Sequence, residues 1–196
     1  MNIAVIQYNA GNIRSVAFAL ERLGVNYIVT DQPEEILKAD KVIFPGVGEA
    51  RSTMSYLKEK KLDQLIIALR QPVLGICLGM QLLCRHSEEN NTPCLGVFDV
   101  SVKKFVSTPQ SKVPHMGWNA LTNVGDWLAS SITEKQVYFV HSYYVPINPF
   151  TTATTIYTVP FSAALRKNNF YGVQFHPEKS AETGEMILKN FLHSSL

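Results

Sequence analysis

The sequence predicts an α/β fold in which a mostly parallel central sheet is flanked by helices. Short apolar runs alternate with segments of helical period through the first half of the chain, which is the pattern of βαβ units. The 196 residues are 46% hydrophobic and 17% charged, so they can bury one substantial core. No internal repeat, low-complexity segment or linker interrupts the chain, and we therefore expect a single domain over residues 1–196.

The first half of the chain is predicted to alternate strands with helices. Each strand is a short apolar run, and the strands cover Asn2 to Gln7, Val25 to Val29, Lys41 to Phe44 and Val73 to Ile76. The helices cover Ile13 to Leu23, Pro33 to Lys38, Met54 to Leu69 and a segment that begins at Met80. Gly24 ends the first helix and Pro33 occupies the first turn of the second, positions that these residue types favour. A parallel sheet of this kind binds ligands at the carboxyl ends of its strands.

The second half changes to short segments with β propensity, followed by one helix. The β-prone segments are Leu95 to Val106, Trp118 to Leu121, Val137 to Val145, Thr152 to Val159, Ala163 to Leu165 and Phe170 to Phe175. The amphipathic segment Glu182 to Leu192 predicts the closing helix.

Composition and charge argue against several classes of function. The formal net charge is +2 and no run of Lys or Arg exceeds two residues, so the chain lacks the basic stripe that nucleic-acid binding needs. The N-terminus has an apolar stretch of only four residues with no basic segment before it, unlike a signal peptide. The most apolar window, Gln64 to Cys84, is interrupted by charged and helix-breaking residues and is unsuited to spanning a membrane. We therefore expect a cytoplasmic protein that binds small molecules or another protein.

The three cysteines predict neither a disulfide framework nor a metal site. Cys77, Cys84 and Cys94 are odd in number and lack the CxxC spacing of zinc ligands. Cys84 is predicted to lie in the core, and Cys94 follows Pro93 in a loop.

Cys77 stands between two glycines in GICLG, Gly75 to Gly79, where an apolar strand turns into a helix. Residues two before and two after such a turn approach so closely that side chains would collide, and GxCxG is thus the thiol form of the nucleophile elbow GxSxG. Unpaired N–H groups at the helix N-terminus favour a thiolate and can donate to an oxyanion. The alternative is a buried cysteine with two incidental glycines.

A cysteine nucleophile needs a base, and His176 is the strongest candidate among the five histidines. It follows an apolar strand in YGVQFHPE, and Pro177 prevents that strand from continuing. Glu178 can then project to the same side and accept a hydrogen bond from the imidazole. The alternative is a histidine of the core or surface, which is also our prediction for His86, His115, His141 and His193.

FPGVG, Phe44 to Gly48, follows another predicted strand. Its glycines allow backbone N–H groups to turn toward a bound carbonyl, as an oxyanion hole requires. It is not a phosphate loop, because the third glycine of GxGxxG is missing and GxxxxGK[ST] occurs nowhere in the chain. The alternative is an ordinary loop between a strand and a helix.

Together these motifs resemble the class I, triad-type glutamine amidotransferases, which have a flavodoxin-like architecture. The resemblance rests on GICLGMQLL, FHPEKS and FPGVG, and it extends over essentially the whole chain. Further segments are similar to the glutaminase subunits that serve histidine biosynthesis: Tyr8 to Val16, Val113 to Asn119, Tyr138 to Tyr144 and Gly172 to Ser180.

The resemblance implies a Cys-His-Glu triad that hydrolyses L-glutamine. Cys77 would attack the side-chain amide, His176 would transfer the proton, and Glu178 would orient the imidazole. Backbone N–H groups of Val47, Gly48 and Leu78 would form the oxyanion hole. The implied contacts to glutamine are Gly46, Gln81, His141, Ser142 and Tyr143.

The resemblance also implies a partner and no cofactor. The partner would be a (β/α)8-barrel cyclase, forming a heterodimer in which ammonia crosses a dry path to make imidazole glycerol phosphate and an aminoimidazole carboxamide ribotide, AICAR. Asn12 and Trp118 lie in segments that match the interface side of the family. Trp118 is alternatively a core residue.

One stretch departs from the family pattern, because Glu49, Ala50 and Arg51 follow GVG where small or apolar residues are common. A carboxylate there opposes negative charge in the oxyanion hole unless Arg51 or solvent screens it. We hypothesise that the loop rests with an N–H turned away and flips when partner and nucleotide bind.

Three other functions remain open on the sequence. A free-standing cysteine peptidase or amidase would need no partner, and HPE together with VPHMGWN counts against it. A glutaminase for pyridoxal phosphate or anthranilate synthesis would share the triad but not YNAGNIRSV and VPHMGWN. A non-catalytic binding module should have lost part of the triad, whereas all three members are present.

Overall fold

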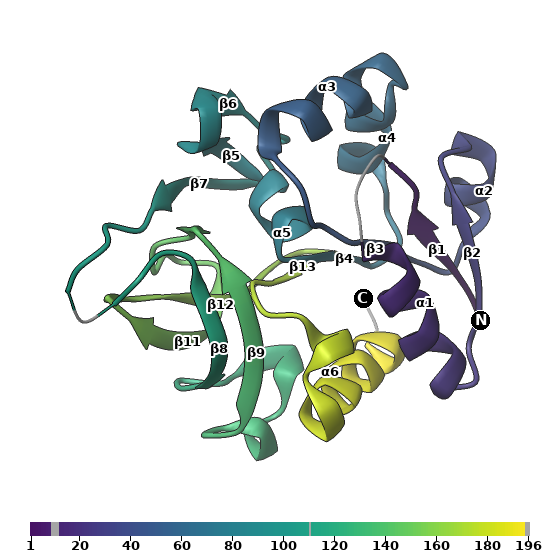
Figure 1. Ribbon diagram of the computed structural model, residues 1–196. Coiled ribbons are helices and arrows are strands. Elements are labelled where there is room, and N and C mark those ends of the chain that lie inside the picture. Colours follow the sequence, from purple (N-terminus) through teal and green to yellow (C-terminus); the bar gives the residue numbers. More distant parts are fainter. Residues whose placement is uncertain (9–11, 110, 195–196) are drawn as a thin grey trace.

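The computed structural model describes residues 1–8, 12–109 and 111–194. Within this part of the chain, seven strands form a central sheet in the order β11-β12-β13-β4-β3-β1-β2 (Figure 1). Five neighbouring strands are parallel: β2 (Asn26–Thr30), β1 (Asn2–Ile6), β3 (Lys41–Phe44), β4 (Val73–Ile76) and β13 (Phe170–Val173). The edge strands β12 (Val159–Lys167) and β11 (Thr151–Tyr157) are antiparallel. The predicted α/β class with a mostly parallel sheet is confirmed.

Helices cover both faces of the central sheet (Figure 1). One face carries α1 (Ile13–Arg22) and α6 (Ala181–His193), and the other carries α3 (Ala50–Glu59), α4 (Leu62–Ala68) and α5 (Leu78–Leu82), with α2 (Pro33–Lys38) near β2. Successive residues of β1 alternate between the two cores, Ile3 and Val5 packing with α1 and α6, and Ala4 and Ile6 with the opposite helices. Continuous apolar runs are therefore buried on both sides, as parallel strands require.

Two smaller sheets lie beside the central one. The first has the order β10 (Tyr143–Tyr144), β7 (Phe98–Lys104), β5 (Cys84–Ser87) and β6 (Thr92–Pro93). The second pairs β8 (His115–Ala120) with β9 (Gln136–His141). Four short 3-10 helices complete the described elements: η1 (Glu89–Asn91), η2 (Asp126–Leu128), η3 (Ser130–Ile132) and η4 (Pro177–Lys179).

Several predicted element boundaries are wrong, and three of these errors have clear physical reasons. The single helix expected over Met54 to Leu69 is interrupted at Lys61, whose φ of 56° is left-handed and separates α3 from α4. The helix expected from Met80 begins at Leu78 and ends at Leu82, because Cys84 starts a strand that pairs with β7. The strand expected over Val137 to Val145 is divided between β9 and β10, which join different sheets.

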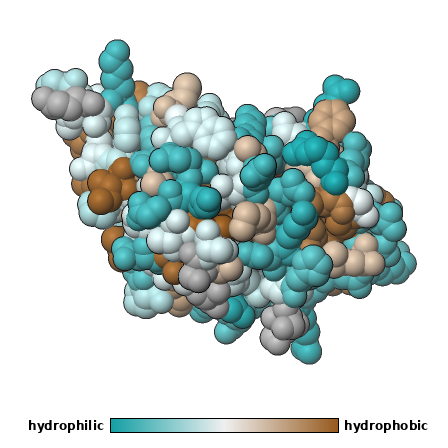
Figure 2. Space-filling model, turned by 90° about the horizontal axis from the view of Figure 1, so that it is seen from below, coloured by the Kyte–Doolittle hydropathy of each residue, from teal (hydrophilic) through white to brown (hydrophobic). Residues whose placement is uncertain are grey.

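The exposed surface is mixed in character. Figure 2 shows hydrophobic patches separated by hydrophilic side chains on the face that it presents. Among the described helices, none is long and apolar enough to cross a membrane. Nor do the described His, Cys, Asp and Glu side chains form a group of three or more that could hold a metal ion.

Candidate active site

The sequence motifs meet at the carboxyl ends of neighbouring strands. Cys77 follows β4, His176 follows β13, and the Gly46 to Gly48 loop follows β3, while β3 and β13 both pair with β4. The sheet order therefore brings together three segments that are far apart in sequence, at the edge where such sheets bind ligands.

Cys77 occupies a strained elbow between β4 and α5. Its φ of 52° and ψ of −108° are unusual for a residue with a side chain, and its N–H donates to the Val173 carbonyl at 2.7 Å. A Cβ on Gly75 would lie 2.8 Å from the Gly79 carbonyl carbon, and a Cβ on Gly79 would lie 2.0 Å from the Phe44 oxygen. Both glycines are therefore required by close backbone approach, as the GxCxG spacing predicts.

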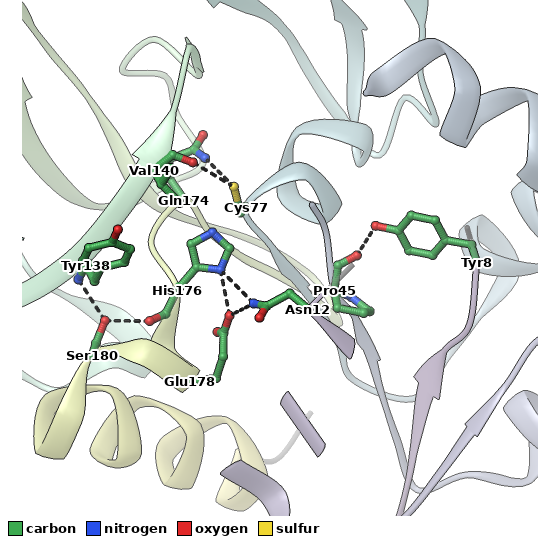
Figure 3. A network of polar contacts seen from close by, with 10 residues as sticks. All are labelled: Tyr8, Asn12, Pro45, Cys77, Tyr138, Val140, Gln174, His176, Glu178 and Ser180. Atoms are coloured by element: carbon green, nitrogen blue, oxygen red, sulfur yellow. Dashed lines mark hydrogen bonds and ion pairs between the residues drawn. The ribbon is translucent and has the colours of Figure 1, made fainter. Parts of the chain in front are cut away.

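His176 and Glu178 form a buried pair below Cys77 (Figure 3). His176 Nδ1 lies 2.7 Å from Glu178 Oε1, and the side chains are 1% and 0% exposed. Because a carboxylate accepts, Nδ1 carries the hydrogen, and Nε2 is the nitrogen left for Cys77. Nε2 is buried and has no hydrogen-bond partner among the described residues.

The backbone of the HPE segment is held by two neighbours. The His176 N–H donates to the Tyr138 carbonyl of β9 at 2.9 Å, and the Ser180 hydroxyl donates to the His176 carbonyl at 2.6 Å. The Tyr138 N–H in turn donates to the Ser180 hydroxyl at 2.9 Å. These bonds fix the imidazole relative to the sheet (Figure 3).

The charge state of His176 is set by opposing effects. Burial is the largest influence and lowers the pKa of His176, but the neighbouring Cys77 sulfur and the Glu178 carboxylate together raise this pKa to about 10. The imidazolium form is thus stabilised where it would arise on accepting the thiol proton.

A cavity of about 260 Å³ opens in front of Cys77. This volume suits a ligand smaller than the drug-sized molecules that fill pockets of about 300 to 1,000 Å³. Every residue predicted for the oxyanion hole or the glutamine contacts lines it: Gly46, Val47, Gly48, Leu78, Gln81, His141, Ser142 and Tyr143.

Three further lining residues were missed from the sequence: Glu89, Pro114 and Val140. The Glu89 carboxylate accepts from the Ala50 N–H at 2.8 Å, and burial is the main cause that raises the pKa of Glu89. In the sequence this residue lies in the polar stretch EENNT, which is typical of a solvated turn. Its contact with Ala50, which is 39 residues away in the sequence, holds it near the Gly46 to Gly48 loop.

Glu49 is held at the start of α3. Its carboxylate accepts from the N–H groups of Arg51 at 2.9 Å and Ser52 at 2.7 Å, and from the Asn90 amide at 2.5 Å. Burial opposes ionisation, but these bonds lower the pKa of Glu49 to about 2. The Arg51 guanidinium donates to the Asn90 carbonyl. Backbone amides and Asn90, and not the Arg51 side chain, therefore compensate the Glu49 charge.

The two predicted interface residues lie in different environments. Asn12 begins α1, and its amide donates to Glu178 Oε1 and lies 3.4 Å from His176 Nδ1, so it belongs to the triad network (Figure 3). Trp118 on β8 is 52% exposed and packs edge-on against Tyr138, which excludes the core alternative. Residues 9–11 of the Tyr8 to Val16 segment lie outside the described residues.

Comparison with known proteins gives one consistent result. Residues 4–195 match the family model "Glutamine amidotransferase class-I". The chain is 61% identical over 194 residues to "Imidazole glycerol phosphate synthase subunit HisH" of Bacteroides fragilis, covering 98% of this chain and 99% of that protein. It is 47% identical over 195 residues to the protein of the same name from Escherichia coli K12, with the same shares covered.

Solved structures share the fold at low sequence identity. A putative GMP synthase protein from Thermoplasma acidophilum has a TM-score of 0.73 and 21% identity, over 98% of this chain and 92% of that one. A glutamine amidotransferase from Thermotoga maritima has a TM-score of 0.65 and 18% identity, over 98% of this chain and 82% of that one. These two comparisons establish the architecture alone.

Proposed function

This chain belongs to the class-I glutamine amidotransferases and to the HisH family within them, and from that premise we propose that it is the glutaminase subunit of an imidazole glycerol phosphate synthase. It hydrolyses L-glutamine for histidine biosynthesis. The observation that carries the proposal is the assembly of Cys77, His176 and Glu178 beside a cavity of about 260 Å³.

The triad accounts for hydrolysis in two steps. In the first, the Cys77 sulfur attacks the side-chain carbonyl carbon of glutamine, and the thiol proton passes through His176 Nε2 to the departing nitrogen, which leaves as ammonia. In the second, His176 removes a proton from water, which attacks the glutamyl thioester. The C–S bond breaks, glutamate forms and the thiol regains its proton. Glu178 orients the imidazole and stabilises its positive charge in both steps.

Groups lining the cavity support the roles of binding and charge stabilisation. Leu78 is the first residue of α5, where N–H groups have no partner within the helix, and Val47 and Gly48 line the same cavity. Each such donor to the oxyanion contributes roughly 3 kcal/mol. Gly46, Gln81 and the segment from His141 to Tyr143 would hold glutamine. The Glu89 carboxylate adds a negative group suited to the α-ammonium.

The proposal includes a cyclase partner. Neutral water would protonate most free ammonia, so the product must pass through a dry path to a second active site. The partner is a (β/α)8-barrel cyclase that forms a heterodimer with this chain in the cytoplasm and makes imidazole glycerol phosphate and AICAR. The exposure of Trp118, 52%, supports a place for it in the interface.

The experiment measures glutamate release from glutamine by the chain alone, with the cyclase, and with cyclase plus nucleotide. We expect a low rate alone, a large increase with both additions, and no activity in Cys77→Ala. Cys94→Ala, which changes a half-buried thiol outside the cavity, should retain the wild-type rates.

Other outcomes of this experiment would favour one of the three alternative functions considered from the sequence. Rapid hydrolysis that is indifferent to the cyclase would leave the triad intact but contradict this pathway. Hydrolysis of peptides or other amides without a partner would indicate a peptidase or amidase. Absence of turnover under every condition would indicate a binding module.

A further inference from the structure

Gln174 is a buried amide beside the Cys77 sulfur, and the two-step scheme above gives it no role. It lies between β13 and His176 and is 0% exposed. Its Nε2 lies 3.6 Å from Cys77 Sγ, and its Oε1 accepts from Gln81 Nε2 at 2.9 Å. Figure 3 shows the Gln174 amide and the Val140 carbonyl together at the sulfur, away from His176.

The orientation of the Gln174 amide follows from a chain of hydrogen bonds that runs from the Tyr143 carbonyl through the Gln81 amide to Gln174. The Tyr143 carbonyl can only accept, so the Gln81 atom that lies 2.9 Å from it must be the nitrogen. That nitrogen also faces Gln174 at 2.9 Å, so the Gln174 atom opposite must be the oxygen. The Gln174 nitrogen is therefore the atom turned toward sulfur. Tyr143 also accepts from His141 Nδ1 at 2.7 Å, which holds the carbonyl in place.

The sulfur thus has neighbours suited to both of its protonation states. The Val140 carbonyl, 3.9 Å from Sγ, can accept only from the neutral thiol. The Gln174 N–H, at 3.6 Å, is best used when the sulfur is negative. The sulfur carries negative charge twice in the proposed cycle, before it attacks glutamine and when it leaves the thioester.

We propose that Gln174 is a further residue of the catalytic machinery, a hydrogen-bond donor to the Cys77 sulfur that is oriented by Gln81 and the Tyr143 carbonyl. The inference rests on the proposed role of Cys77 as nucleophile. No atom is transferred through Gln174, because the amide keeps both protons while His176 moves the thiol proton. The donor lies opposite the imidazole, so it favours the thiolate without competing for His176 Nε2.

The test measures the rate at which iodoacetamide alkylates Cys77 as a function of pH, in the wild type and in Gln174→Met. Cys94 is followed in the same samples by peptide-resolved mass spectrometry as an internal reference. Gln71→Met is the matched control. Gln71 precedes β4, at the end of the strand opposite to Cys77, and its Nε2 donates to the Ile36 carbonyl at 2.9 Å. Thermal melting establishes that each variant is folded.

In Gln174→Met we expect the alkylation profile of Cys77 to move to higher pH and the rate near neutral pH to fall roughly 3- to 10-fold, the range for losing one ordinary hydrogen bond. Cys94 should react at the wild-type rate, and Gln71→Met should leave Cys77 unchanged. A Cys77 profile in Gln174→Met that superimposes on that of the wild type would overturn the proposal.

A second measurement needs no change at Gln174. In the 15N-labelled wild type, the side-chain amide protons of Gln174 should shift with pH at the midpoint of Cys77 alkylation, and this response should be lost in Cys77→Ala. The proposal is contradicted if the Gln174 amide signal does not change with pH in the wild type, or if it changes in the same way in Cys77→Ala. Failure of the proposed function gives a different result, in which the wild-type chain with cyclase and nucleotide releases no glutamate whatever the alkylation profile of Cys77.

Discussion

At the residue scale, the site combines local strain with buried charge. The left-handed φ of Cys77 is of a kind that costs about 1 to 3 kcal/mol, and it persists because the surrounding glycines, α5 and the Val173 carbonyl determine the turn. Glu178 is likewise held by two donors, His176 and Asn12. Reactive groups are thus fixed by neighbours that do not themselves react.

Glu89 gives a prediction about substrate affinity. In Glu89→Gln we expect the KM for glutamine to rise about tenfold with kcat nearly unchanged, because a carboxylate that binds the α-ammonium equally in ground and transition states affects binding alone. Steady-state kinetics with the cyclase and nucleotide measure this.

The neighbouring Glu88 provides the control for that substitution. Its carboxylate binds Lys103 Nζ at 2.9 Å and the Lys104 N–H at 2.8 Å, and it does not line the cavity. Glu88→Gln should therefore leave KM unchanged. Equal KM values for both variants would show that Glu89 does not contact glutamine.

The site residues that the sequence predicts are those whose signal is local. GICLG, FPGVG and HPE each encode a turn and a reactive group within a few residues, so Cys77 and His176 could be placed before any contact was known. Glu89 and Gln174 carry no such signal, because their positions depend on contacts between distant segments: Glu89 is bound by the Ala50 N–H, and Gln174 follows β13, which pairs with β4. Tyr8 reaches Pro45 in the same way, through the pairing of β1 with β3.

At the element scale, α6 positions the segment that carries His176. It starts directly after η4, and a Cβ on Gly184 would lie 1.9 Å from the Pro177 oxygen, so helix and HPE segment are in close contact. The far end of α6 is held by Lys41 of β3, which is 6% exposed. Its Nζ donates to the carbonyls of Phe191 at 2.8 Å and Ser194 at 2.5 Å.

Lys41→Met should lower the free energy of unfolding by about 1 to 3 kcal/mol, because carbonyls at the end of α6 lose a charged donor in a buried position. Urea denaturation monitored by circular dichroism measures the change. Lys38→Met, at an exposed position in the last turn of α2, is the control and should change stability by less than about 0.5 kcal/mol. An equal effect of the two substitutions would show that the contact to α6 adds no stability.

The hairpin of β8 and β9 contains a buried histidine pair. His141 Nδ1 donates to the Tyr143 carbonyl, so His141 Nε2 accepts from His115 Nδ1 at 3.0 Å, and protonation of His141 would break this bond. Burial lowers the pKa of His115 to about 4 and is the main cause that lowers the pKa of His141 to about 3.

These pKa values predict loss of stability in acid. The unfolded chain takes up protons as pH falls below about 6.5, whereas the folded pair stays neutral down to about pH 4. The contribution of the pair to folding stability is therefore fully present above about pH 6.5. Between about pH 6.5 and pH 4, each histidine lowers the free energy of unfolding by about 1.4 kcal/mol for each unit that the pH falls.

His115→Phe tests this pH dependence. Phenylalanine can keep the stacking on Phe139 and Tyr157, whose ring centroids lie 4.9 and 4.0 Å from that of His115, while removing one titrating group. The loss of stability between pH 6 and pH 5 should become smaller by roughly 1 kcal/mol in urea denaturation. His193→Phe, at an exposed position, should retain the wild-type slope. An unchanged slope in His115→Phe would mean that His115 is already protonated in the folded state.

At the scale of the whole molecule, the sheet order collects loops from β1, β3, β4 and β13 at one edge. The alternation of apolar and amphipathic segments predicts this parallel sheet, because each βαβ unit is recognisable within about 30 residues. The arrangement after Pro93 could not be predicted in the same way. Its short strands divide between three sheets according to partners up to dozens of residues away, and their local propensity does not distinguish these partners.

Two residues between β1 and α1 contact the oxyanion segment and the triad. The Tyr8 hydroxyl, after β1, donates to the Pro45 carbonyl at the start of FPGVG, and the Asn12 amide, just before α1, donates to Glu178 (Figure 3). Glu49 holds the far end of FPGVG to α3. The three residues from Gly46 to Gly48 therefore lie between two anchors, and our hypothesis is that this segment flips when the cyclase and nucleotide bind.

Removing the first anchor should weaken the dependence on the partner. In Tyr8→Phe we expect the glutaminase rate of the free chain to rise several-fold and the stimulation by cyclase and nucleotide to fall by a similar factor, because the resting loop loses one bond that the flipped loop does not need. Glutamate release with and without the partner measures both numbers. Tyr56→Phe, which removes a hydroxyl bound to Asp31 at 3.1 Å, is the matched control and should leave the ratio unchanged. Tyr8→Phe could instead lower the rates of glutamate release with and without the partner by the same factor. The Tyr8 hydroxyl would then support the active conformation of the Gly46 to Gly48 segment and not its resting conformation, and the flip would not begin at Pro45.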